Sequence, residues 1–142
     1  MKHLYLKILE LLSKIEEIQY IDLEYGQLQE EMPSISYPAA LINMDLNRTE
    51  SLTSGVQDVI ANFEIKLITK AGDVNNVTPE KYQNQSLEFL ELQEKVFEVL
   101  QDYQDNKLEP FERKGVRNLN IRKGLRVLSC SYETGWRVDL TN

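Results

Sequence analysis

The strongest constraint on the fold is one long amphipathic stretch, residues 78–103. Its first residues, Thr78, Pro79 and Glu80, suit an N-cap, a first helical position and a first helical turn. The apolar residues that follow recur at helical spacing and form a wide stripe: Phe89, Leu90, Leu92, Val96, Phe97, Val99, Leu100 and Tyr103. A helix with such a stripe must bury it, and we expect a sheet to receive it because alternating stretches stand on both sides.

Two stretches before this helix are typical of strands. Val59, Ala61, Phe63, Ile65 and Leu67 alternate with mostly polar residues, as in a half-buried strand. An earlier strand is predicted over residues 38–44, where an Ala-Ala-Leu-Ile run indicates burial on both faces. We predict that these two strands pair as an antiparallel hairpin. The polar loop that would connect them, residues 47–55, is long for a hairpin connection.

The remaining segments complete the order of elements. A first helix is predicted over residues 2–18 and a short strand over residues 21–25. Residues 27–37 are expected to form a surface loop without regular structure. Residues 116–121 and 128–140 predict a second hairpin that turns at 122–124. The predicted fold is therefore α+β, an antiparallel β-sheet with two helices on one face, in the order α-β-β-β-α-β-β. All 142 residues are expected to form one domain.

The charge of the chain is negative and unevenly spread. The net charge is −7, which argues against general nucleic-acid binding because phosphates are held by basic surfaces. Residues 1–112 carry 21 acids and nine bases, whereas residues 113–142 carry two acids and seven bases. The apolar runs are far shorter than the roughly 20 residues of a membrane-spanning helix. With a single cysteine, which cannot form an internal disulfide, the sequence favours a cytosolic protein.

Side chains that carry covalent chemistry are few and separated. His3, the only histidine, stands at the start of the first predicted helix, and we interpret it as a mobile surface residue. Cys130 falls on the apolar side of its strand, where a cysteine packs as a small hydrophobe. One histidine and one cysteine cannot supply a usual zinc ligand set, and no phosphate-binding glycine-rich loop occurs. We therefore expect no enzyme, no cofactor and no metal.

Two oppositely charged sets form the first candidate functional surface. The acidic set lies at spacings of three and four on the long predicted helix: Glu91, Glu94, Glu98 and Asp102. The basic set contains no acid: Arg113, Lys114, Arg117, Arg122, Lys123 and Arg126. The simpler interpretation is a solvated helix face. The sharper hypothesis is that the two sets meet, within the molecule or across a subunit boundary, and set register and partner choice.

The polar loop at 47–55 is the second candidate. It is either an ordinary hairpin tip or a contact segment that becomes ordered when it docks on a partner. The candidate contact residues are Asn47, Arg48, Thr49, Glu50, Ser51 and Leu52.

The order of these elements also resembles that of a known family. A helix over residues 2–18 precedes Tyr-Pro-Ala-Ala-Leu-Ile at 37–42, a polar loop, and Gln-Asp-Val-Ile-Ala-Asn-Phe-Glu-Ile-Lys-Leu at 57–67. A long helix and a C-terminal pair of strands follow. This arrangement resembles the tail terminator (tail completion) proteins of long-tailed bacteriophages and prophages.

The resemblance implies a structural role. A subunit of this family would join a ring, expected to be a hexamer, that caps the finished tail tube and faces the head-tail connector. Its partners would be its own copies, the tail-tube protein and the connector, and DNA would only pass through an acidic lumen. It would be found in the host bacterial cytoplasm during assembly and then in the virion tail. The alternatives are a neck or connector subunit, a tail-tube subunit, or a monomeric acidic adaptor module.

Overall fold

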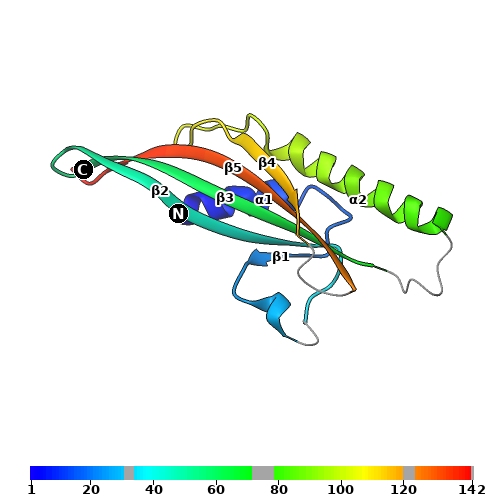
Figure 1. Cartoon of the computed structure of the whole chain (residues 1–142). Helices are drawn as coiled ribbons and strands as arrows, with labels where there is room; N and C mark the ends of the chain where they lie inside the picture. The colour runs from blue at the N-terminus through cyan, green and yellow to red at the C-terminus, as the bar shows by residue number, and fades with distance from the viewer. Residues whose placement is uncertain (31–33, 72–78, 120–123, 142) are drawn as a thin grey trace.

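The computed structural model describes residues 1–30, 34–71, 79–119 and 124–141. Its elements are α1 (Lys2–Leu12), β1 (Tyr20–Leu23), a 3-10 turn η1 (Gln27–Gln29), β2 (Ala39–Thr53), β3 (Val56–Lys70), α2 (Pro79–Leu100), β4 (Glu112–Asn118) and β5 (Leu125–Asp139) (Figure 1). The predicted α+β class and the order α-β-β-β-α-β-β are confirmed.

The five strands form one sheet in the order β1-β2-β3-β5-β4. All neighbours pair antiparallel except β1 and β2, whose four paired residues run parallel. A parallel pair needs a long crossover, and the segment between β1 and β2 provides one. That segment was predicted to lack regular structure, but it contains η1, which follows Gly26 in the left-handed conformation (φ 98°).

Both helices pack on the same face of the sheet, as predicted. At the centre of this core, the ring of Phe63 stacks on Tyr132 with centroids 5.2 Å apart and meets Phe111 edge-on at 5.0 Å. Cys130 lies fully buried beside them, which confirms its predicted packing role. On the opposite face a smaller apolar cluster includes Ala39 and Leu41, so the Ala-Ala-Leu-Ile run is buried on both faces as predicted.

Several element ends differ from the predicted ones. Helix α1 ends at Leu12, and Ser13 is its C-cap residue. Backbone hydrogen bonds between residues three apart then turn the chain, and Ile15 and Ile18 still lie in the core. Helix α2 ends at Leu100, three residues early, and Asp102 then takes a positive φ of 63°. Strand β4 begins at Glu112 rather than 116. Thr78 and the turn residues 122–123 lie outside the described residues.

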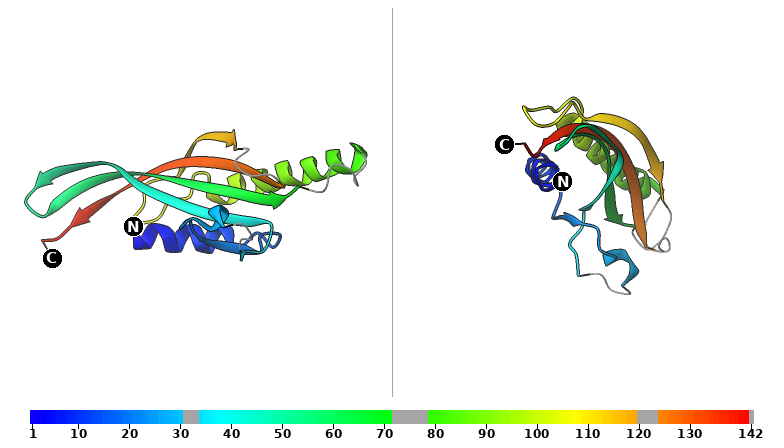
Figure 2. Two further views of the ribbon diagram at one scale, coloured as in Figure 1. Left: turned by 60° about the horizontal axis from the view of Figure 1, so that its bottom comes forward. Right: turned by 90° about the vertical axis from the view of Figure 1, so that its left-hand side faces the viewer.

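The largest error concerns the loop predicted at 47–55. Strands β2 and β3 stay paired up to Thr53 and Val56, so the connection is only Ser54 and Gly55. Strand β5 continues beside them to Asp139. We call the outer ends of these three strands, residues 47–58 and 137–139, the arm. It projects beyond both helices (Figure 2). Neither face of the arm is covered by a helix, so its residues are polar on both faces. The sequence there therefore lacks the apolar alternation from which a strand is predicted.

Candidate assembly surfaces

The arm holds its shape by backbone pairing and polar side-chain contacts. Residues 47–53 are all exposed, so burial contributes little to their order. Arg137 on β5 donates two hydrogen bonds to Asp58 on β3, at 2.8 and 3.3 Å. These bonds hold the pKa of the Asp58 carboxyl below its usual value. Arg48 and Glu50 form a looser pair at 3.6 Å. The six candidate contact residues therefore present their side chains on a preformed strand.

The part of β5 next to the arm is hydrogen-bonded to the segment that follows α2. The amide of Glu109 donates to the carbonyl of Gly135 at 2.9 Å, and the Thr134 hydroxyl donates to the Glu109 carbonyl at 2.8 Å. This close approach requires a glycine at 135, because an added Cβ would lie 2.8 Å from the Val59 carbonyl oxygen.

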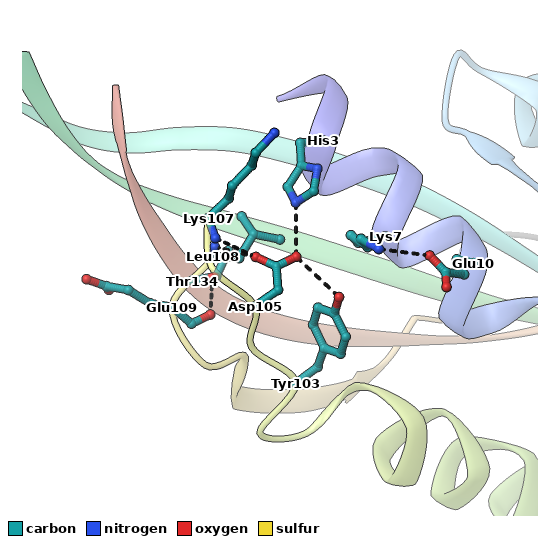
Figure 3. Close-up of polar contacts among 9 residues, drawn as sticks. All are labelled: His3, Lys7, Glu10, Tyr103, Asp105, Lys107, Leu108, Glu109 and Thr134. Carbon is teal, nitrogen blue, oxygen red and sulfur yellow. Dashed lines mark hydrogen bonds and ion pairs between the residues drawn. The ribbon is translucent and has the colours of Figure 1, made fainter. Parts of the chain in front are cut away.

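A polar cluster then ties the same segment to the start of α1 (Figure 3). Asp105 accepts hydrogen bonds from His3 at 3.0 Å and from the Tyr103 hydroxyl at 3.2 Å. Its other oxygen accepts from the amides of Lys107 and Leu108. Burial raises the pKa of Asp105, but the bonds from the Lys107 amide, His3 and the Leu108 amide outweigh burial and lower it to about 2. The expectation of a mobile His3 was wrong, because this histidine is fixed by a partner 102 residues away.

The basic set contacts several parts of the fold. The Arg113 guanidinium lies 3.9 Å from the centroid of the Phe97 ring on α2. Lys114 pairs with Glu112 at 3.3 Å and with Glu133 at 3.9 Å. Arg126 donates to the Ser86 hydroxyl at 2.7 Å.

Two other members of the basic set, Arg122 and Lys123, lie outside the described residues, and Arg117 is exposed on β4. Glu91, Glu94, Glu98 and Asp102 are all exposed. Within the described ranges, no ion pair joins the acidic set to the basic set. A contact across a subunit boundary therefore stays a prediction.

The sheet face opposite the helices is hydrophilic beyond the small apolar cluster. Lys66 contacts Glu24 at 2.7 Å and Glu64 at 3.8 Å, and the Ser129 hydroxyl donates to Glu64. A shallow hollow of about 390 Å³ lies farther along, lined by residues that include Asn43 and Asp45. We call this the open face, and its mixture of charges and amides suits contact with water.

Groups for covalent chemistry do not converge in the part of the chain that the structure describes. No cluster of three or more His, Cys, Asp or Glu side chains there is arranged to hold a metal ion. Burial raises the pKa of the Cys130 thiol to about 11, which leaves it protonated and unreactive at neutral pH. Neither described helix has the length and apolar character needed to cross a bilayer.

No protein-family model matches this chain, and a search of curated proteins likewise finds no match.

Proposed function

We propose that this chain is a structural subunit that assembles with its own copies into a ring and caps the tail tube of a long-tailed bacteriophage or prophage. The observation that supports self-assembly best is the arm, three paired strands that project beyond both helices. An uncovered strand ribbon contributes little to the stability of a monomer, so a contact role explains its length. The assignment to a phage tail rests on the resemblance in element order.

The charged sets support a contact between non-identical surfaces of neighbouring subunits. Glu91, Glu94 and Glu98 are exposed on α2 and Asp102 is exposed just after it, and β4 carries basic side chains along an edge of the sheet. A contact between one subunit's α2 and the next subunit's β4 is heterologous, and such contacts close into a ring when the rotation between subunits permits. The open face would then border the central opening, where its carboxylates would keep DNA from adhering.

The proposal is tested by the mass and shape of the purified protein. Light scattering at several protein concentrations, with and without purified tail tubes, should give a defined multiple of the 16.6 kDa chain. Negative-stain images should show rings with a central hole that attach to tube ends. A tail-tube subunit would polymerise into long tubes instead. Single chains at every concentration, with no binding to tubes, would contradict the proposal.

A charge swap tests the predicted contact. Lys114→Glu with Arg117→Glu, or Glu94→Lys with Glu98→Lys, should each prevent assembly and leave the far-UV circular dichroism unchanged. All four substitutions in one chain should restore the ring, because the two surfaces are again complementary. A matched control, Lys2→Glu, changes an exposed charge elsewhere on the molecule and should have no effect.

A further inference from the structure

The outer edge of β2 is open along the arm. Strand β1 pairs only with Ala39–Ile42, so within the described residues no strand lies beside β2 from Asn43 to its end. The side chains of residues 45–53 are exposed there as well. The backbone of an open edge carries N–H and C=O groups that a further strand can bind. A strand of matching sequence would therefore extend the sheet at this edge.

The sequence of this edge is complementary to itself about Thr49. In an antiparallel pair of two copies centred on Thr49, the Arg48 of each copy lies opposite the Glu50 of the other. Opposite charges that face each other directly stabilise a strand pair, and so do facing threonines. Leu46 and Leu52 are 47% and 44% exposed and lie at equal distances from Thr49 along the chain. The same register therefore brings leucines together at both ends of the paired stretch.

The two charges of this stretch are available to a second copy. Within one chain, Arg48 and Glu50 form a loose pair at 3.6 Å, and their side chains are 67% and 61% exposed. The residue that faces Glu50 on β3 is Asp58, and its carboxylate is already bound by Arg137. An opposite charge from a second copy therefore adds to the contacts of Arg48 and Glu50 without displacing a tight ion pair.

The length of the open edge fits the same register. Thr49 is the midpoint between Asn43, the first residue beyond the part covered by β1, and Gly55 in the turn at the tip. A pair centred on Thr49 therefore places the tip of each arm at the far end of the partner's open edge, without meeting β1. Because the arm projects beyond both helices, the two bodies would lie at opposite ends of the paired arms (Figure 2).

We propose that two copies of this chain pair antiparallel through the outer edges of their arms, with a two-fold axis at Thr49 and Arg48 of each copy facing Glu50 of the other. Strand β2 has one register shift on each side of Thr49, so the pairing is most regular over residues 48–50. The same surface is used by both copies, so the contact closes with two chains. It differs from the contact between α2 and β4, and it does not rest on the proposed ring.

Cysteine cross-linking locates the two-fold axis, with little background because Cys130 is fully buried. Thr49→Cys should yield a disulfide-linked dimer on mild oxidation, resolved on a non-reducing gel. Directly opposed residues have Cα atoms roughly 4.5–5.5 Å apart, within the range that a disulfide spans. The control is Thr53→Cys, an exposed threonine on the same strand. Its two copies would lie roughly 26 Å apart at about 3.3 Å per residue, so little dimer should form.

Charge reversal tests the facing pairs. The background is the chain with Lys114→Glu and Arg117→Glu, in which the proposed ring should not form. Arg48→Glu or Glu50→Arg alone places like charges opposite each other and should weaken dimerisation roughly tenfold or more in sedimentation experiments. Both substitutions in one chain should restore the dimer, and so should an equal mixture of the two single variants, because opposite charges face each other again.

The outcomes separate this pairing from the proposed ring. Thr49→Cys that cross-links no more than Thr53→Cys would overturn the arm pairing and leave the proposed function intact. Rings that never form, in a protein whose Thr49→Cys variant cross-links as expected, would remove the proposed function and leave the arm pairing intact.

Discussion

The arm and the helix-covered body are built from the same three strands but are stabilised differently. In the body, β3 alternates between buried and partly exposed residues, and Ile65 and Leu67 are completely inaccessible to solvent. In the arm, the side chains of β2 are exposed from residue 45 onward, and order comes from backbone ladders on both sides of β3. A strand such as β2 can therefore extend well beyond the core when a neighbouring strand pairs with its backbone, but its sequence there carries no burial pattern.

The largest difference in stability between the body and the arm is expected when a side chain at the centre of the body is truncated. Phe63→Ala removes a ring that contacts both Phe111 and Tyr132. The free energy of unfolding, measured by urea denaturation at a concentration where the protein is monomeric, should fall by about 3–5 kcal/mol. The matched change in the arm, Thr49→Ala, should cost less than about 0.5 kcal/mol. Equal losses would mean that the arm is part of the cooperative core.

The junction between the two regions is tested by Gly135→Ala. The added methyl group would collide with the Val59 carbonyl and the Glu109 carboxylate, each 2.8 Å from the Cβ position. We expect a loss of about 1–3 kcal/mol in the free energy of unfolding, with faster hydrogen exchange in the arm. Gly115→Ala on β4 is the control, because no atom lies within 4 Å of its added Cβ. If Gly135→Ala left the free energy of unfolding unchanged, the contacts of Gly135 with Val59 and Glu109 would have adjusted to the added methyl group without cost.

Removing the charge of Asp105 should have an intermediate effect. Asp105→Asn weakens the cluster that joins α1 to the segment after α2, and should cost about 1–2 kcal/mol at pH 7. Because the pKa of Asp105 in the folded protein is about 2, below the ordinary value of 3.8, the carboxylate stabilises the fold above about pH 4. That contribution disappears as the pH falls toward 2.

The pH dependence of unfolding checks this assignment. Wild-type protein should lose stability between about pH 4 and pH 2 more steeply than Asp105→Asn. The arm residue Asp58 provides the comparison: Asp58→Asn should flatten the curve less than Asp105→Asn, because the pKa of its partly exposed carboxyl is lowered by a single partner, Arg137. Identical curves for wild type and Asp105→Asn would contradict the role given to Asp105.

The smallest effect is expected at the tip of the arm. Leu52→Ala removes an exposed side chain and should change the stability of the monomer by less than about 0.5 kcal/mol. Urea denaturation of dilute protein measures this value directly. A loss of 2 kcal/mol or more would show that Leu52 packs within its own chain.

Sequence patterns predicted the elements that burial creates. The stripe on α2 and the alternation of β3 and β5 follow from packing against one core, so they were visible. The outer part of β2 was predicted as a loop because residues such as Asn47 and Ser51 face water on both sides. Phe111 was missed because it is a lone aromatic residue in a polar segment.

The charged surfaces were only partly predictable. The two sets were visible as runs of like charge, but the contacts of Arg113 with Phe97 and of Arg126 with Ser86 depend on which strand lies under which part of α2. The bond between His3 and Asp105 joins residues that the fold alone brings together, and no local pattern signals it. The cavity beside Phe89 and Leu92 likewise arises from five separate segments of the chain.

The parallel strand β1 has a consequence for how the molecule avoids fibre formation. It covers only Ala39–Ile42 of β2, so in the described chain the outer backbone of β2 from Asn43 onward has no neighbouring strand. Such a row of free amides and carbonyls is a template for amyloid-like stacking. The register shifts at Asn47 and Leu52 interrupt the template twice, because each extra residue kinks the strand. Deleting both residues would straighten this edge and favour insoluble fibres over finite particles.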